Sequence, residues 1–304
     1  MDQANMLRNM VLEKPPAAKP EYVGTARVIT ITSGKGGVGK SNFSVNLAIY
    51  FAQKGKRVVV LDADFGLANV EVLFGVVPKY SLADTLSGKM TIDDIITDGP
   101  GNVKFISAGS GLKTLTNITD KQLGYLVSSL SRLDQIADII LVDTGAGVSN
   151  TVKDFILASN ETIIVTTPEP TSMTDAYALI KMVKEETTDL PAFKFIINRT
   201  ESSSEGDSIF QKLQAVSGKF LGITLQFLGN APYDAQLVKA VKSQQPVLLY
   251  APNSHFAKAV TEIGDKLLKS GETAVGKEVQ KEERRGIKSF FKRLVQSSQS
   301  KKED

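Results

Sequence analysis

The chain has 304 residues, of which 42% are hydrophobic and 23% are charged, and its formal net charge is +3. These values are ordinary for a globular protein, and the charge is too small to argue by itself for nucleic-acid binding. The absence of cysteine excludes disulfides and cysteine-ligated metal or iron–sulfur centres, and it is compatible with a reducing cytoplasm. Because no apolar run approaches the length of a membrane span, we expect neither a signal peptide nor a transmembrane helix.

Residues 1–24 form a segment that we expect to lie apart from the folded core. Within 2–12 an apolar face has helical spacing, and it consists of Met6, Leu7, Met10 and Val11. An isolated helix this short is marginal in water, so we expect disorder until a partner binds it. The proline-rich stretch 14–20 favours extended chain. This arrangement is typical of a docking motif on a tether; an extension without a role is the alternative.

A glycine-rich loop at 34–39 is the most informative stretch of the chain. It follows a β-branched run at 27–32 and precedes apolar residues at helical spacing over 42–51, which gives the order strand, loop, helix. Glycines let backbone N–H groups turn around phosphate oxygens, and the helix N-terminus adds unpaired donors. The predicted phosphate-binding residues are Gly34, Lys35, Gly36, Gly37, Val38, Gly39, Lys40, Ser41 and Asn42.

In this interpretation Lys40 reaches the β- and γ-phosphates of ATP or ADP, and the Ser41 hydroxyl ligates Mg²⁺. A glycine-rich turn with incidental lysines is the alternative.

The rest of the core, residues 25–270, alternates strand and helix patterns without a composition break. Continuous β-branched runs predict strands at 57–61, 103–108, 138–143, 162–166 and 193–198. Apolar residues at helical spacing predict helices at 120–133, 150–158, 172–186, 208–216, 235–241 and 255–269. This order predicts a single α/β domain with a doubly wound, mostly parallel sheet.

Acidic residues follow two of the predicted strands, at Asp62, Asp64 and Asp143. Ligands of open α/β sheets bind at the carboxyl ends of the strands, where these residues stand. A carboxylate that faces a phosphate loop there can hold Mg²⁺ through its water shell. The alternative, that an acidic residue merely caps a loop, weighs most for Asp62.

The last segment, 271–304, consists of a polar linker followed by a basic amphipathic helix. The apolar stripe has the spacing i, i+3, i+4, i+7, i+8 and consists of Ile287, Phe290, Phe291, Leu294 and Val295. Basic residues flank it at Arg284, Arg285, Lys288, Lys292 and Arg293. We expect weak, reversible binding to an anionic membrane surface, which strengthens when two copies are held together. The alternative is that this helix packs on its own core or on a partner.

The loop Lys-Gly-Gly-Val-Gly-Lys-Ser, with a second lysine at Lys35, resembles the deviant Walker A signature of the MinD/ParA ATPases. The resemblance implies an ATPase with a P-loop NTPase fold that forms a homodimer on ATP, in which Lys35 reaches the phosphates of the partner subunit. It implies that Asp64 orients the attacking water, that Asp143 is the Walker B carboxylate and that Asp62 assists Mg²⁺. It also implies adenine contacts, made by Asn198, Arg199 and Pro232.

Within the MinD branch the chain resembles the FlhG (YlxH/FleN) family, which regulates the number and placement of flagella. Three features carry this resemblance: an N-terminal motif, the stretch 64–69 that matches switch I, and the C-terminal helix that matches a membrane anchor. In the family the N-terminal motif activates the GTPase FlhF, a relative of the signal-recognition particle. The matching residues here are Asp2, Gln3, Leu7 and Arg8.

The resemblance further implies that Gln3 acts at the GTPase site of FlhF. It also implies contacts with basal-body (C-ring) components of the flagellum, and a cytoplasmic protein that associates peripherally with the membrane in its ATP state.

Two other functions remain open at this point. A ParA-like ATPase for DNA partitioning, or one that places the division site, shares the same loop. DNA binding needs a basic patch on the folded domain, whereas here the concentrated basic residues share a helix with two phenylalanines, so we do not expect nucleic acid as a partner. Iron-protein or metal-carrier relatives depend on cysteine ligands, which this chain lacks.

Overall fold

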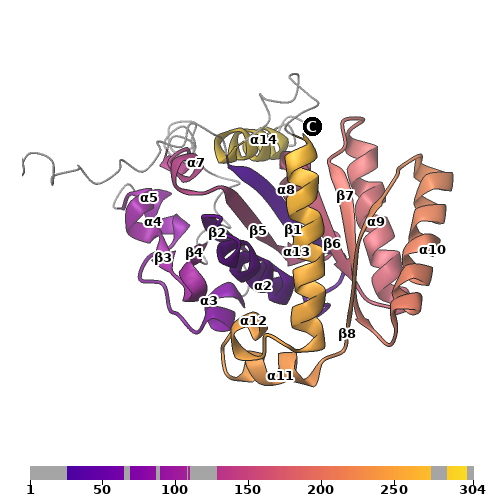
Figure 1. The fold of residues 1–304 in the computed structure, drawn as a ribbon. Coiled ribbons are helices and arrows are strands. Elements are labelled where there is room, and N and C mark those ends of the chain that lie inside the picture. Colours follow the sequence, from indigo (N-terminus) through magenta and orange to yellow (C-terminus); the bar gives the residue numbers. More distant parts are fainter. Residues whose placement is uncertain are drawn as a thin grey trace, which may run out of the picture.

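The computed structural model describes residues 26–64, 69–86, 90–107, 109, 129–274 and 286–299. Across these residues one sheet has the strand order β3-β4-β2-β5-β1-β6-β7-β8 (Figure 1). Every neighbouring pair is parallel except β3 with β4. The strands are β1 Arg27–Ser33, β2 Val58–Ala63, β3 Thr97–Asp98, β4 Lys104–Ser107, β5 Ile139–Ala146, β6 Glu161–Thr166, β7 Ala192–Thr200 and β8 Gln226–Pro232.

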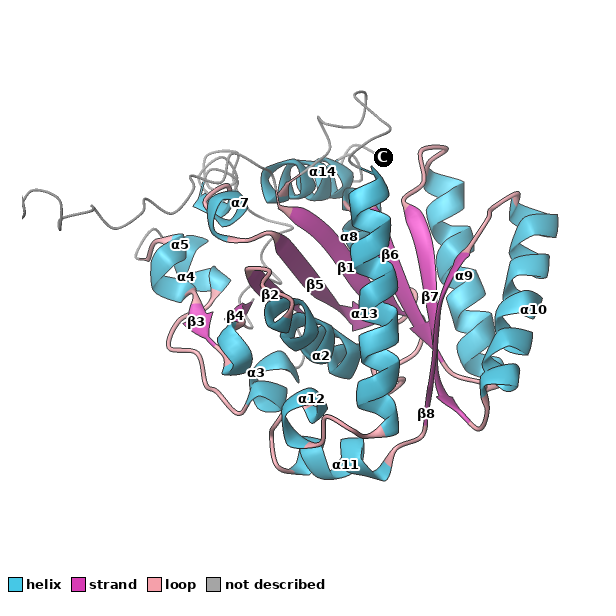
Figure 2. Cartoon of the chain, viewed as in Figure 1, coloured by secondary structure: helices cyan, strands magenta, loops and turns pink. Residues whose placement is uncertain are grey.

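Helices cover both faces of the sheet (Figure 2). Alternate residues of β1 show this, because Ile29 and Ile31 pack in one core with α2 and α13 whereas Val28 packs in another with α8 and α14. A third core lies between α9, α10 and strands β6 and β7. The helices are α2 Lys40–Gln53, α3 Asn69–Phe74, α4 Leu82–Leu86, α5 Ile92–Ile95, η1 Pro100–Asn102, α7 Leu133–Ile136, α8 Asn150–Ala158, α9 Pro170–Glu186, α10 Ser203–Leu221, α11 Ala235–Lys242, α12 Val247–Tyr250, α13 His255–Ala274 and α14 Ile287–Gln299.

The predicted doubly wound α/β fold is therefore confirmed, with differences at some elements. Strand β8 has no counterpart in the prediction because it is an edge strand with a glycine and a terminal proline, which hide the usual β signal. Helix α13 continues to Ala274, into the stretch expected to be linker. Most of the helix predicted at 120–133 lies outside the described residues.

Charged side chains form a hydrogen-bonded network at the amino ends of the strands, opposite the glycine loop. Arg27 of β1 donates two hydrogen bonds of 2.7 Å to the Glu161 carboxylate of β6, and Lys194 of β7 donates one of 2.6 Å. Arg27 also donates to the carbonyl of Leu267 in α13. Burial raises the pKa of Glu161, but the hydrogen bonds and charges of Arg27 and Lys194 outweigh it and hold that pKa at about 2. This network links three strands and one helix.

Replacing Glu161 by glutamine should lower the free energy of unfolding by about 2 to 3 kcal/mol at pH 7. The pKa of Glu161 is lower in the folded state than the ordinary 4.5, so its contribution is complete above pH 4.5 and is lost as the pH falls towards 2. Urea denaturation of both proteins at several pH values measures the difference. The exposed Glu185, replaced in the same way, serves as the control. A Glu161→Gln effect that stays constant from pH 7 to pH 3 would contradict the assignment.

Candidate functional site

The glycine loop joins β1 to α2 at the carboxyl edge of the sheet, and close packing fixes its backbone. A Cβ at Gly34 would lie 2.4 Å from the backbone of Asp175 in α9. Gly39 has a φ of +99°, and a Cβ there would lie 2.4 Å from Nδ2 of Asn198. A side chain at Gly34 would collide with backbone, and the left-handed φ of Gly39 strains any residue with a Cβ, so the loop requires glycine at both positions.

Lys40, at the start of α2, lies in a buried ion pair with Asp143 of β5. Its Nζ is 3.0 Å from Oδ1 of Asp143, and these side chains are 6% and 0% exposed. The hydroxyl of Ser44, one turn along α2, donates to the same oxygen at 2.7 Å. The other oxygen of Asp143, Oδ2, is buried and has no hydrogen-bond partner within the described part of the chain. Asp143 thus keeps one oxygen bonded and one without a partner.

The residues here fit a magnesium ion. Mg²⁺ in phosphate sites takes one or two protein oxygens and completes its shell with phosphate and water. The unpaired oxygen of Asp143 is a hard, negatively charged donor, and the Ser41 hydroxyl lies 3.4 Å from Nζ of the Lys40 that Asp143 binds. Ser41 and Asp143 could therefore hold the ion, and this predicted role stays a prediction.

Asp62 lies beside Asp143, because strands β2 and β5 pair these two residues in register. Its carboxylate accepts hydrogen bonds from the backbone N–H groups of Asp64 and Val70, both at 3.1 Å. Burial and then the charge of Asp143 raise the pKa of Asp62 to about 7. Asp62 therefore binds the backbone at both Asp64 and Val70, and its predicted role towards Mg²⁺ stays a prediction.

Asp64 lies at the border of the same site. Its Oδ2 accepts a hydrogen bond of 3.3 Å from Asn69, and its Oδ1 is 3.7 Å from the position that a Cβ on Gly145 would take. Gly145 belongs to β5, two residues beyond Asp143. The structure thus brings Asp64 to the strand that carries Asp143, the predicted Walker B carboxylate; residues 65–68 lie outside the described residues.

Lys35 is bound to its own chain in this structure. Its Nζ lies 2.6 Å from Oε2 of Glu169 and 3.0 Å from the hydroxyl of Thr171, at the start of α9. The hydrogen bond and the charge of Lys35 lower the pKa of Glu169. Sequence reasoning missed both partners, because an exposed glutamate and a threonine in the first turn of a helix carry no signal of their own. The predicted reach of Lys35 across a dimer stays a prediction.

Asn198 and Arg199, at the end of β7, donate hydrogen bonds to backbone carbonyls of the glycine loop. Asn198 donates to the carbonyl of Val38 at 2.7 Å, and Arg199 donates to that of Gly37 at 2.8 Å. Pro232 lies at the end of β8, where it pairs with Thr200. These contacts give Asn198 and Arg199 a role in shaping the loop, while adenine contacts by the three predicted residues stay predictions.

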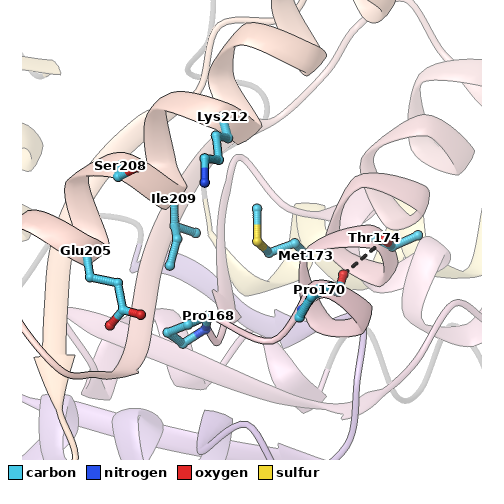
Figure 3. Close-up of a pocket in the computed structure, with 8 residues that line it drawn as sticks. All are labelled: Pro168, Pro170, Met173, Thr174, Glu205, Ser208, Ile209 and Lys212. Carbon is cyan, nitrogen blue, oxygen red and sulfur yellow. Dashed lines mark hydrogen bonds between the residues drawn. The ribbon is translucent and has the colours of Figure 1, made fainter.

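A pocket of about 490 Å³ lies between α9 and α10, and Figure 3 shows the side chains on both helices and on the loop before α9. Its lining residues are Pro168, Pro170, Met173, Thr174, Glu205, Ser208, Ile209 and Lys212. None of the predicted nucleotide-site residues lines it. Pro168 and Pro170 do flank Glu169, so this pocket adjoins the segment that binds Lys35.

The C-terminal helix α14 packs on its own domain. Ile287 and Phe290 are 0% exposed, Phe291 is 2% exposed and Leu294 is 5% exposed. The ring of Phe290 lies 6.1 Å from that of Phe155 in α8. The stripe predicted to enter a membrane is thus buried against the sheet in this structure, which is the alternative stated above; the side chain of Val295 lies outside the description.

The N-terminal residues Asp2, Gln3, Leu7 and Arg8 lie outside the described residues. Among the helices that the structure does describe, none is long and apolar enough to cross a membrane.

Comparison with known proteins places these features in a family. A sequence model described as ParA, NUBPL iron-transfer P-loop NTPase matches residues 24–268. The chain is 41% identical to the antiactivator FleN of Pseudomonas aeruginosa over 79% of this chain and 86% of that protein. It is 36% identical to the flagellum site-determining protein YlxH of Helicobacter pylori over 97% of this chain and 98% of that protein.

Among solved structures, the cell division ATPase MinD of Pyrococcus furiosus aligns with a TM-score of 0.64 at 24% identity, over 81% of this chain and 99% of that one. The septum site-determining protein MinD of Pyrococcus horikoshii, solved in complex with Mg-ADP, gives the same score and identity over 82% and 98%. These likenesses support the fold. The family model over residues 24–268, together with the relatives at 41% and 36% identity, establishes that the chain belongs to the ParA/MinD family of P-loop NTPases, in the group of FleN and YlxH.

Proposed function

We propose that this protein is an ATP-driven switch that regulates the number and placement of flagella. The observation that carries this proposal is the similarity to YlxH, which spans nearly the whole of both chains. MinD of Helicobacter pylori, named for the septum site, matches at a lower 30% identity, so flagellar placement is favoured over division-site placement. A metal-carrier role is not favoured, because the sequence offers no cysteine ligand.

Each of the site residues has a separate role in phosphoryl transfer. The loop N–H groups cradle the phosphates, and Lys40 turns from Asp143 to the β- and γ-phosphates. Ser41 and Asp143 would hold Mg²⁺, which supplies charge neutralisation when bound. Asp64, next to β5, orients the water that attacks the γ-phosphate. Since little covalent chemistry is required of the protein, position and charge account for most of the rate.

Dimerisation completes the site in this proposal. Lys35 must leave Glu169 and Thr171 before it can reach the phosphates of a partner subunit. This ion pair is exposed and therefore weak, so a nucleotide phosphate in a closed dimer competes for Lys35 effectively. Hydrolysis then ends the dimer state and resets the switch.

In this proposal the C-terminal helix α14 binds the membrane only in the ATP-bound dimer. Ile287, Phe290, Phe291 and Leu294 of this helix, α14, are buried against its own domain, so membrane binding requires that α14 leaves that position. Two released helices in one dimer bind with avidity that one helix lacks. The N-terminal segment acts separately, as an activator of the FlhF GTPase.

Asp64→Ala should keep Mg-ATP binding and lose turnover by roughly 10²-fold or more, because the attacking water loses its orienting carboxylate. ATP should hold this variant as a dimer in sedimentation velocity, and cells that carry it should show an altered number of flagella under the electron microscope. Asp98→Ala, at an exposed carboxylate far from the loop, is the matched control. Unchanged turnover, or a monomer at saturating ATP, would refute the dimer switch.

Deletion of residues 284–296 should abolish ATP-dependent co-sedimentation with vesicles that contain anionic lipid. Lys288→Glu with Lys292→Glu changes two exposed residues without touching the buried stripe. The loss of about 1 kcal/mol for each lysine should by itself weaken binding roughly 30-fold, and repulsion of the two added carboxylates should weaken it further. Neutral vesicles provide the control. If both variants sediment like the unaltered protein, the tail is not the anchor.

A peptide of residues 1–20 should stimulate the GTPase activity of FlhF, since the resemblance places the activating motif there. The same peptide with Gln3→Ala should be inactive, and one with Lys19→Ala, outside the motif, should be fully active. Phosphate release measures each rate. No stimulation by the unaltered peptide would remove FlhF from the proposal.

A further inference from the structure

The two oxygens of the Asp143 carboxylate have different surroundings. Oδ1 accepts hydrogen bonds from Nζ of Lys40 at 3.0 Å and from the hydroxyl of Ser44 at 2.7 Å. Oδ2 is buried and has no hydrogen-bond partner among the residues that the structure describes. Because both donors act on one oxygen, they fix the rotation of the carboxylate and leave Oδ2 as the oxygen available to a ligand.

Ser44 reaches Asp143 because it lies one helical turn after Lys40. Residues i and i+4 of a helix share a face, so α2 directs both side chains towards β5. The Ser44 hydroxyl also lies 3.2 Å from the carbonyl of Lys40, which is the usual acceptor for a serine inside a helix. A hydroxyl has a single proton to donate, and the shorter distance and negative charge of Asp143 favour the carboxylate as its acceptor.

Burial gives this hydrogen bond its importance. Ser44 and Asp143 are both 0% exposed, so bulk water does not replace a donor that is lost. Strands β2 and β5 place Asp62 beside Asp143, and like charges repel strongly in buried surroundings. A donor on Oδ1 offsets part of that repulsion and keeps the carboxylate from turning away from the glycine loop.

Nucleotide binding changes the donors of Oδ1. In the proposed mechanism Lys40 exchanges Asp143 for the β- and γ-phosphates, which removes one of the two donors that the structure describes. Ser44 lies inside α2, beyond the first N–H groups of the helix that face a phosphate, so its hydroxyl stays on Oδ1.

We infer that Ser44 is a positioning residue for the metal ion: its hydroxyl holds Oδ1 of Asp143 so that Oδ2 stays available to Mg²⁺. This inference rests on the proposed Mg-ATP switch, and it adds a residue that acts on the ion only through Asp143. Ser44 therefore affects the dependence of nucleotide binding on Mg²⁺. A serine that merely joined α2 to β5 would affect nucleotide binding with and without the metal alike.

The test uses the full-length protein and a fluorescent ADP analogue, titrated in EDTA and at increasing Mg²⁺. Ser44→Ala removes the hydroxyl and adds no volume. Its affinity for the analogue in EDTA should stay that of the unaltered protein, since Ser44 lies outside the glycine loop. The Mg²⁺ concentration that gives half of the metal-dependent gain in affinity should rise about 10- to 100-fold, the usual cost of removing a hydrogen-bond partner of a metal ligand.

ATP turnover gives a second readout. The apparent KM for Mg²⁺ should rise by the same factor, while kcat returns to that of the unaltered protein at saturating Mg²⁺. Ser217→Ala is the matched control, because Ser217 is equally buried in α10 and its hydroxyl has no partner within the described part of the chain. Its Mg²⁺ dependence should be unaltered. Circular dichroism establishes that each variant is folded.

A double substitution tests the route through Asp143. In an Asp143→Asn background, Ser44→Ala should change the Mg²⁺ dependence no further, since the carboxylate through which it acts is gone. A further loss there would overturn the inference. So would equal Mg²⁺ dependence of Ser44→Ala and the unaltered protein, or equal weakening in EDTA and in Mg²⁺; each of these results leaves the ATP switch in place. If the unaltered protein binds the analogue under neither condition, the proposed switch fails, and the inference fails with it.

Discussion

A buried lysine–carboxylate pair anchors the nucleotide loop to the sheet. Lys40 and Asp143 are almost completely shielded from water, and buried charges are costly unless they are paired and hydrogen-bonded. Ser44 supplies a further hydrogen bond to Asp143, and backbone N–H groups hold the neighbouring Asp62, whose pKa is raised to about 7. In the proposed mechanism, a phosphate that takes Lys40 breaks this pair.

The charged groups at the amino ends of the strands differ from those at the carboxyl ends. At the amino edge, Arg27, Glu161 and Lys194 satisfy one another, and this saturation makes that edge rigid. At the carboxyl edge, Asp143 retains a buried oxygen without a partner, and Lys35 lies in an exposed pair that solvent weakens. The groups that must exchange partners lie at this carboxyl edge, in contacts that a ligand can replace.

The sequence predicted the fold and the centre of the site well, because each depends on local patterns. Strand, glycine loop and helix follow one another without interruption, and the carboxylates come directly after β-branched runs, which places Lys40, Asp143 and Asp62 together before any coordinates are known. Contacts between distant segments were not predictable. Glu169 and Arg293 have ordinary local surroundings, and their roles arise only because α9 and α14 lie where the fold brings them.

The C-terminal stripe shows why sequence alone could not choose between lipid and protein. Ile287, Phe290, Phe291 and Leu294 need an apolar environment, and either a bilayer interface or the protein core beside α8 provides one. A helix that fits both places can be moved between them by a small free-energy difference, which a reversible switch requires. The polar residues discriminate between the two environments, because lipid phosphates accept from any exposed cation, whereas the carbonyl of Ala158 accepts from Arg293 only when α14 is docked.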